Sequence, residues 1–300
     1  MWFDVNEIVP GKSFEIKGIS YIGKPKSNTA MFLTKKAEYL IGSLAEVDDC
    51  LVFIEATIDI PYDLAGRHAF KKSYRPQLEY AKFASLFAAE RLKEEQEIPV
   101  YLTSQGYYCS SDAVIGENAY IEPGCYIGPD VAVGKNAYIM AGTVIRHATI
   151  GDDFISNEYA IIGANGFTMA EDENGSKYRI PTLGRVVIGN YVEVGAHDNI
   201  SCGSGGDTVI DDFVKLDALV HLGHDVHLHK NVEIAAGGII GGFDELGENS
   251  YVGINAVLRN RIKIGNNSIV GMGATVTKSV EDNVVVAGNP ASFLRKAVEK

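Results

Sequence analysis

The chain has 300 residues, of which 46% are hydrophobic, and a formal net charge of −12. This length and hydrophobic content can fill the cores of two ordinary domains and exclude a disordered chain. The acidic balance argues against nucleic acid or an anionic membrane surface as the main partner, because both require basic patches. No stretch approaches the ~18 apolar residues of a membrane span, and no secretory signal begins the chain, so we expect a cytoplasmic protein.

Residues 1–105 predict a small α/β domain. Apolar runs over residues 19–22 and 50–54 are typical of short strands. Residues 77–95 predict a helix that begins after Pro76, because Tyr80, Phe83 and Phe87 would share one of its faces.

A six-residue period predicts the fold of residues 106–287. It fits neither an α-helix nor a lone amphipathic strand and is typical of a parallel β-helix, in which three hexapeptides form one triangular coil. Inward aliphatic side chains then stack on residues 18 positions away. The period appears in an early run (Ile115, Ile121, Ile127, Val133, Ile139, Ile145), a middle run (Ile188, Val194, Ile200) and a late run (Ile210, Leu216, Leu222, Leu228, Ile234, Ile240, Leu246, Val252, Leu258, Ile264, Val270, Val276).

Three interruptions of the period predict loops that leave the coil. The step shortens to five residues after Ile145, an excursion over about residues 165–185 follows Ile162, and a four-residue insertion follows Ile200. The two longer ones adjoin the histidine-rich coil in the sequence and are expected to carry binding residues. Glycines just after the inward position, such as Gly116, are expected to supply corner conformations that a Cβ would obstruct, and Asn and Asp nearby are expected to serve the same turns. Residues 288–300 predict a short tail that caps the last coil.

Three stretches resemble the UDP-3-O-acylglucosamine N-acyltransferases of lipid A synthesis. They are SNTAMFLTKKAEYL, similar to that family's uridine-binding motif, GANGFTMAEDENGSKYRIPTLGRVVIG, similar to its Gly-Phe loop, and GDTVIDDFVKLDALVHLGHDVHL, similar to the stretch that holds its catalytic histidine. The resemblance implies a left-handed β-helix and a homotrimer. It also implies transfer of an acyl group from a carrier thioester to the amino group of a nucleotide-linked sugar, for lipid A of lipopolysaccharide or another surface glycan.

The resemblance implies roles for individual residues. His224 would be the general base, in a cleft between neighbouring subunits, and Phe32 and Tyr39 would sandwich the uracil. An imidazole with a pKa of about 6.5 can accept the proton of an amine as that amine attacks a thioester. Gly242 lies 18 positions after His224, so the next coil offers no side chain there and leaves room for a substrate. The expected substrate-binding residues are Phe32, Tyr39, Asn165, Phe167, Asp217, Asp225, Gly242 and Arg261.

Three features depart from the pattern of that family. The family's Arg-Gly-Ala after the coil at Ile200 is replaced by Cys202-Gly203-Ser204-Gly205-Gly206. Arg261 stands where the family has a second histidine, and by the count of 18 it stacks over Phe243 and Asp225. The family's C-terminal helical extension, associated with acyl carrier protein, is replaced by AGNPASFLRK, which resembles the ending of CoA-dependent sugar acetyltransferases. The donor therefore stays open between acyl-CoA and acyl carrier protein, and the acceptor between a UDP- and a dTDP-linked amino sugar.

A metal enzyme and a binding scaffold are the alternative functions. His221, His224, His227 and His229 form a cluster in the sequence, and histidine is a common zinc ligand. Positions six apart, such as His221 and His227, lie on different faces of a coil and cannot converge within one chain. A trimer interface can bring histidines together, as in the β-helical carbonic anhydrases. We expect no metal and no cofactor besides the acyl donor; a non-catalytic solenoid that binds nucleotide sugars is the remaining alternative.

Overall fold

The computed structural model describes residues 2–296 and divides them into two compact units. The N-terminal unit comprises residues 2–96, 167–183 and 204–206, and the β-helix unit comprises residues 97–166, 184–203 and 207–296. Of the tail expected over residues 288–300, residues 297–300 lie outside the described part. Among the described residues, no helix combines the length and the apolar character needed to cross a lipid bilayer.

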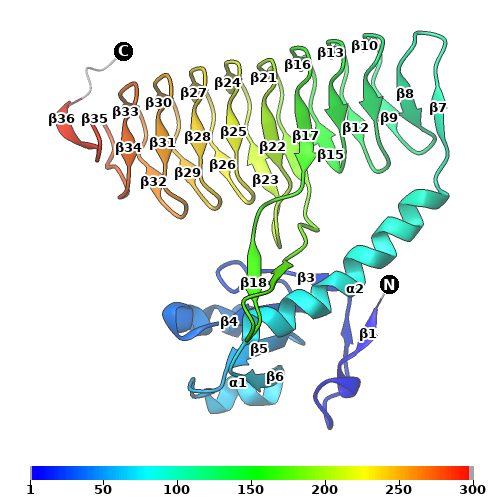
Figure 1. The fold of residues 1–300 in the computed structure, drawn as a ribbon, viewed down its shortest axis with the longest axis vertical. Helices are drawn as coiled ribbons and strands as arrows, with labels where there is room; N and C mark the ends of the chain where they lie inside the picture. The colour runs from blue at the N-terminus through cyan, green and yellow to red at the C-terminus, as the bar shows by residue number, and fades with distance from the viewer. Residues whose placement is uncertain (1, 297–300) are drawn as a thin grey trace. The chain divides into compact units, whose positions relative to one another are not determined.

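Three sheets of short parallel strands form the sides of the β-helix unit, and we name them S1, S2 and S3 (Figure 1). S1 contains β10 (Tyr120–Ile121), β13 (Tyr138–Ile139), β16 (Ile155–Ser156), β21 (Glu193–Val194), β24 (Lys215–Leu216), β27 (Glu233–Ile234), β30 (Tyr251–Val252), β33 (Ile269–Val270), β35 (Val284–Ala287) and β36 (Ser292–Lys296). S2 contains β7 (Val100–Leu102), β8 (Tyr108–Ser110), β11 (Tyr126–Ile127), β14 (Val144–Ile145), β17 (Ile161–Ala164), β22 (Asn199–Ser201), β25 (His221–Leu222), β28 (Ile239–Ile240), β31 (Val257–Leu258) and β34 (Thr275–Val276). S3 contains β9 (Val114–Ile115), β12 (Ala132–Val133), β15 (Ala148–Ile150), β20 (Val186–Ile188), β23 (Thr208–Ile210), β26 (His227–Leu228), β29 (Glu245–Leu246) and β32 (Lys263–Ile264).

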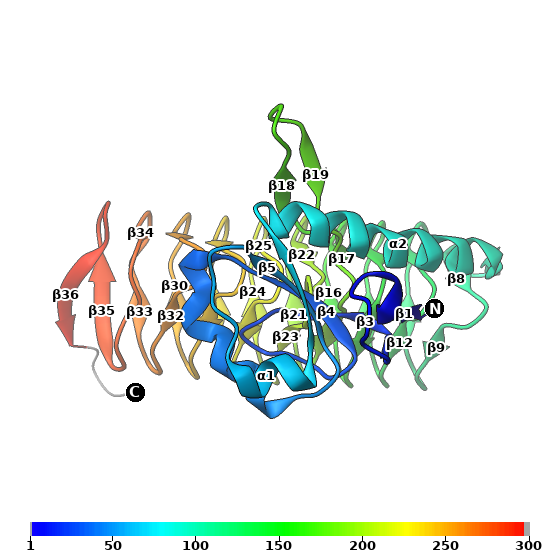
Figure 2. The ribbon, with the colours of Figure 1, turned by 90° about the horizontal axis from the view of Figure 1, so that it is seen from below.

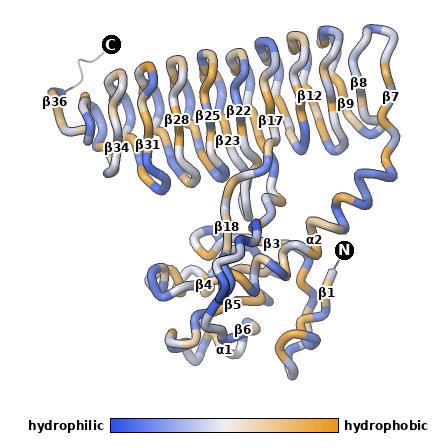
Figure 3. Tube along the Cα trace, in the orientation of Figure 1, coloured by the Kyte–Doolittle hydropathy of each residue, from blue (hydrophilic) through white to orange (hydrophobic). Residues whose placement is uncertain are grey.

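The inward aliphatic residues form the core of this unit, as the six-residue period predicts. In S2, Leu222 pairs with Ile240, and in S3, Leu228 pairs with Leu246, so each residue stacks on the one 18 positions later. These four side chains are fully buried. Full burial of such a side chain contributes roughly 1.5–3 kcal/mol. Hydrophobic and hydrophilic residues alternate along the coils as a result (Figure 3).

The corners of the coils require close approach between successive coils and a left-handed backbone conformation, and different residues meet these two requirements. The glycines after the inward position permit close approach between coils: a Cβ at Gly116 would lie 2.4 Å from the carbonyl carbon of Gly134. The left-handed backbone conformation falls two residues later, for instance at Asn118 and Asn136, with φ of 60° and 56°. The corners thus have glycine where a Cβ would obstruct and asparagine or aspartate in the turn, as expected; these two residues tolerate the left-handed conformation best among residues with a side chain.

The N-terminal unit is built on a parallel sheet of β3 (Gly18–Ile19), β4 (Thr29–Leu33), β5 (Leu51–Glu55) and β6 (Ala69–Ser73). Two hydrophobic clusters cover its two faces. One face packs on α2 (Pro76–Glu97), which confirms the predicted helix, through Tyr80, Phe83 and Phe87. The other face packs on the 3-10 helix η2 (Lys35–Glu46) through residues such as Leu44. The unit also contains β1 (Phe3–Asp4), η1 (Val5–Glu7), β2 (Glu15–Ile16) and α1 (Tyr62–Arg67).

The long excursion of the repeat belongs to the N-terminal unit. It forms the hairpin of β18 (Met169–Glu171) and β19 (Lys177–Arg179), labelled in Figure 2. Ala170 and Ile180 are buried in the same cluster as Tyr80, and Arg75 donates a hydrogen bond to the carbonyl oxygen of Glu171 at 3.1 Å. The apolar residues of the hairpin are thus buried in the core of the N-terminal unit and not in that of the β-helix.

The shorter insertion also packs within the N-terminal unit. Residues 204–206 belong to it, and a Cβ at Gly205 would lie 2.7 Å from the carbonyl carbon of Ser20. This close approach explains the glycine at that position.

The last coil ends in a hairpin. Strand β35 pairs parallel with β33, and β36 folds back antiparallel on β35, at the end of the stacked coils (Figures 1 and 2). The hairpin continues S1 by two further strands.

Candidate active site

All three interruptions of the repeat occur at the same corner of the coil, between an S2 strand and the next S3 strand. The shortened step lies between β14 and β15, the excursion between β17 and β20, and the short insertion between β22 and β23. His224 lies at this same corner, between β25 and β26. We name it the S2–S3 corner. It is the corner at which the chain departs most from the regular repeat, and the candidate catalytic residue lies there.

The imidazole of His224 is oriented by the next residue in the chain. Its Nδ1 lies 2.8 Å from Oδ2 of Asp225, whose side chain is only 3% exposed. Asp225 has a left-handed φ of 59°, and its backbone N–H donates to the buried hydroxyl of Thr208 at 3.0 Å. Because a carboxylate only accepts, this contact puts the imidazole hydrogen on Nδ1 and leaves Nε2 as the basic nitrogen of the neutral ring.

Gly242 lies against the basic nitrogen of His224. A Cβ built at Gly242 would be 2.9 Å from Nε2 and 3.0 Å from Cε1 of the ring. Any larger residue at this position would therefore displace the imidazole. The count of 18 correctly predicts that these two residues are neighbours in successive coils.

At the S2–S3 corner of the two coils that follow His224, the side chains are an aromatic ring and a guanidinium. The ring of Phe243 meets the imidazole of His224 edge to face, with centroids 5.0 Å apart. Arg261 places its guanidinium carbon 4.0 Å from the centroid of Phe243. The predicted stacking of Arg261 over Phe243 is thus present, and it brings a permanent positive charge to the coil after the one that carries Gly242.

A buried carboxyl group fixes the backbone around Gly242. Asp244 is 1% exposed, and its two oxygens accept hydrogen bonds from the backbone N–H groups of Gly241 and Ile262, both at 3.0 Å. Burial raises the pKa of this carboxyl to about 7. The bonds connect two successive coils at the corner and hold Gly242 in place.

Asp217 lies at a different corner from His224. It follows β24, at the turn from S1 to S2, and its carboxylate accepts backbone hydrogen bonds from Ala218 at 2.8 Å and Ala236 at 3.2 Å. It lines a shallow cavity of about 540 Å³ over S1, together with Glu158, Glu193, Lys215, Glu233 and Tyr251. His224 is not among the residues that line this cavity. Within one chain, the structure therefore does not bring these two residues together.

Phe32 and Tyr39 lie in parts of the N-terminal unit that face opposite sides of its sheet. The ring of Phe32 packs on Tyr80 of α2, with centroids 5.1 Å apart. Tyr39 is 82% exposed and belongs to η2, which packs on the other face. A sandwich of one base between the two rings is not preformed in this arrangement.

Asn165 and Phe167 follow β17, where the chain leaves the coil. Asn165 is exposed, and Phe167 is 81% exposed, with the guanidinium carbon of Arg179 5.5 Å from its ring centroid. Phe167 belongs to the N-terminal unit and Asn165 to the β-helix unit.

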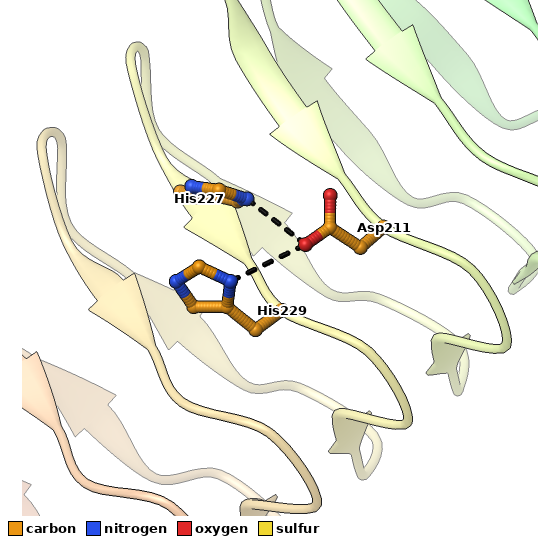
Figure 4. Close-up of side chains that lie close together, drawn as sticks. All are labelled: Asp211, His227 and His229. Carbon is orange, nitrogen blue, oxygen red and sulfur yellow. Dashed lines mark hydrogen bonds and ion pairs between the residues drawn. The ribbon is translucent and has the colours of Figure 1, made fainter.

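One cluster in the β-helix unit is not indicated by the six-residue spacing of the histidines. His221 and His227 lie in S2 and S3, as that spacing predicts, but His227 and His229 share the outer face of S3. They meet Asp211 of the preceding coil, as Figure 4 shows. The signal was present, because His227 and His229 are two residues apart and Asp211 precedes His229 by 18.

Comparisons with known proteins show local similarity to hexapeptide-repeat transferases. A family model described as bacterial transferase hexapeptide (six repeats) matches residues 112–147 and 245–278. A UDP-3-O-acylglucosamine N-acyltransferase 2 of Legionella pneumophila is 47% identical over 103 residues, which are 34% of this chain and 30% of that protein. A UDP-3-O-acylglucosamine N-acyltransferase of Coxiella burnetii is 43% identical over 93 residues, which are 31% of this chain and 27% of that protein. The chain thus spans about 30% of the length of the curated relatives it matches.

The likeness to solved structures covers a larger share of this chain. A UDP-N-acetylglucosamine acyltransferase from Campylobacter jejuni superposes with a TM-score of 0.55 at 25% identity, over 62% of this chain and 73% of that one. The predicted left-handed parallel β-helix is confirmed. Residues 112–147 and 245–278 are thus similar to the hexapeptide repeats of bacterial transferases.

Proposed function

We propose that this protein is an N-acyltransferase that moves an acyl group from a thioester to the amino group of a nucleotide-linked sugar. The observation that carries the proposal is the environment of His224, whose Nδ1 is held by Asp225 at 2.8 Å while its Nε2 lies against a residue without a side chain. The local identity to UDP-3-O-acylglucosamine N-acyltransferases supports the same reaction class.

In the reaction that we propose, Nε2 of His224 acts as the general base. The sugar amine attacks the thioester carbonyl carbon, a C–N bond forms, and the amine proton passes to Nε2. The C–S bond then breaks, and the departing thiolate takes a proton from the imidazolium, so that an amide and a free thiol result. Asp225 stabilises the transient imidazolium through its contact with Nδ1, as the acidic member of a catalytic triad does.

Arg261 is suited to the acyl donor side of this reaction. Its guanidinium is always charged and binds phosphate oxygens well, and the CoA group carries several phosphates. We therefore favour acyl-CoA as the donor, with acyl carrier protein, whose prosthetic arm carries one phosphate, as the second candidate. Both donors and nucleotide sugars are made in the cytoplasm, so the reaction belongs there.

Tyr39 is suited to contact the nucleotide base. A tyrosine that exposes 82% of its side chain has a ring face available for stacking, whereas Phe32 contributes to the core of the N-terminal unit. We also expect a homotrimer, because the family resemblance places its active sites between subunits. Light scattering on the purified protein should give three times the mass of a single chain.

The reaction can be tested by following free thiol. Purified protein is incubated with acyl-CoA, or with acyl carrier protein, and a UDP-sugar that carries a free amine; the proposal predicts thiol release with one amide formed per thiol. The matched control is the same UDP-sugar with its amine already acetylated, which should release none. If every amino sugar tried binds but none consumes thioester, the proposal is wrong and a nucleotide-sugar-binding scaffold is the better description.

A further inference from the structure

A second group of polar side chains lies on the outer face of S3, away from the S2–S3 corner. His227 and His229 flank the inward Leu228, so both point outward. Oδ2 of Asp211 lies 3.1 Å from Nε2 of His227 and 3.3 Å from Nδ1 of His229 (Figure 4). The three side chains are about one third exposed, at 37%, 30% and 29% for Asp211, His227 and His229. They are thus accessible from solvent and partly shielded from it.

We propose that Asp211, His227 and His229 form a binding site for a zinc ion. Two imidazole nitrogens and one carboxylate oxygen are a ligand set that zinc accepts, with solvent as the fourth ligand. This site is separate from the acyl transfer proposed for His224 and does not depend on it.

The distances between the three ligand atoms suit a tetrahedral ion. Ligands at 2.0–2.2 Å from zinc in a tetrahedral site lie about 3.3–3.6 Å from one another. The two nitrogen–oxygen distances of 3.1 and 3.3 Å are close to this value, and all three atoms lie within 4.8 Å of one another.

The surroundings of His229 provide the outer support that zinc-bound histidines usually have. Its other nitrogen, Nε2, lies 3.3 Å from Oε1 of Glu245, and Oε2 of Glu245 lies 2.6 Å from Nζ of Lys263. A carboxylate on the far nitrogen fixes the orientation of a metal-bound imidazole and raises its basicity. A neutral imidazole carries only one N–H and can satisfy only one of its two carboxylate neighbours. A cation on Nδ1, with the hydrogen on Nε2, satisfies both.

The register of the β-helix explains why these residues converge. Asp211 and His229 occupy the same position in successive coils, and His227, Glu245 and Lys263 occupy a second column beside them. In the coil after His229 the corresponding position is Gly247, so this position adds no side chain, and Glu245 is the residue of that coil that contacts the imidazole. The rigid spacing of the coils therefore preorganises the ligands.

Zinc binding to the full-length protein tests the proposal. Protein stripped with a chelator is titrated with Zn²⁺ in competition with a fluorescent zinc indicator, and with Co²⁺ to record the visible absorption of a tetrahedral site. We expect one ion per chain. Asp211→Asn and His229→Ala should abolish binding, and Glu245→Gln should weaken it about 10- to 100-fold without changing the stoichiometry.

Two substitutions serve as controls. His197→Asn removes a corner histidine outside the site at a left-handed position that asparagine tolerates, with φ of 59°, and His224→Ala removes the candidate base. Both should bind zinc as the wild type does. The proposal is overturned if the folded wild type, checked by circular dichroism, binds no zinc, or if Asp211→Asn and His229→Ala bind it unchanged. In either case the three residues form only a hydrogen-bonded network, and the assignment of acyl transfer is unaffected.

Discussion

The imidazole of His224 is held by three different kinds of contact. Asp225 fixes Nδ1 at 2.8 Å, the ring of Phe243 lies edge-on at 5.0 Å, and the backbone of Gly242 limits the space beside Nε2. Neighbouring residues thus fix the tautomer of this imidazole, the plane of its ring and the space beside Nε2. The geometry therefore suits proton transfer at a fixed position.

Gly242→Ala is expected to reduce acyl transfer about 10- to 100-fold, because the imidazole must move when a methyl group appears 2.9 Å from Nε2. The fold should be retained, since the φ of Gly242 is not in the left-handed region. Steady-state thiol release measures the effect, and thermal melting checks the fold.

Gly66→Ala is the matched control, because a Cβ at Gly66 meets no atom within 4 Å. It should leave the rate unchanged. Equal rates for Gly242→Ala and wild type would show that the space beside Nε2 plays no part in the reaction.

The burial of His68 leads us to expect that the N-terminal unit loses stability in acid. The residue is fully buried; its Nδ1 accepts the N–H of Cys50 at 3.3 Å and its Nε2 donates to the carbonyl oxygen of Leu44 at 3.1 Å. Burial lowers the pKa of His68 below its ordinary value. His68 therefore takes up a proton at a higher pH in the unfolded chain than in the folded one. The stability that neutral His68 contributes is fully present above about pH 6.5 and is lost as the pH falls below that value.

Hydrogen exchange in β5, corrected for the intrinsic exchange rate, measures this effect between pH 7 and pH 5. Protection should fall with pH in the wild type. In His68→Leu protection should be weaker at pH 7, because two backbone groups lose their partner, but it should depend less on pH. An equally steep loss of protection in both proteins would assign the acid sensitivity to other groups.

At the scale of the structural elements, ladders of asparagine stabilise one edge of the β-helix. Asn231, Asn249, Asn267 and Asn283 lie in successive coils, and each of the first three donates a side-chain hydrogen bond to the next at 3.0–3.2 Å. Each also has a left-handed φ between 53° and 59°. Asparagine thus meets a backbone requirement and adds a bond between coils.

Asn249→Ala should destabilise the β-helix unit by roughly 1–2 kcal/mol, because alanine pays the cost of a left-handed conformation and loses the ladder bonds. Asn249→Gly loses the bonds but avoids the conformational cost, so it should lie between alanine and wild type. Urea denaturation followed by circular dichroism ranks the three proteins. An alanine variant as stable as the glycine variant would rule out a backbone cost at this corner.

The elements themselves were largely predictable from sequence. A strict period places Leu222 on Ile240 and Gly242 beside His224 without any further information, because a coil of fixed length leaves one possible register. The contact of His224 with Asp225 is harder to predict from the sequence, since it depends on the rotamers of the two side chains. Asp211 and His229 are also 18 positions apart, so the same count indicates their contact, whereas the six-residue spacing of His221 and His227 does not.

At the scale of the whole molecule, the division into units was harder to predict than the repeat. The excursion that contains β18 and β19 leaves the β-helix in the sequence, but its buried residues Ala170 and Ile180 pack in the core of the N-terminal unit. No period marks such contacts, since they depend on tertiary packing between segments about 90 residues apart, such as Gln77 and Met169. The position of the excursion can therefore be predicted from the sequence, but the residues that it contacts cannot.

The rate of acyl transfer by His224→Ala tests the central claim most directly. If Nε2 of His224 is the general base, the substitution should lower kcat about 100-fold or more, with little change in KM for the amino sugar, because the side chain acts in the transition state. His197→Asn should retain the wild-type rate. A His224→Ala enzyme that works within about threefold of wild type would contradict the assignment, since loss of a general base costs far more than that.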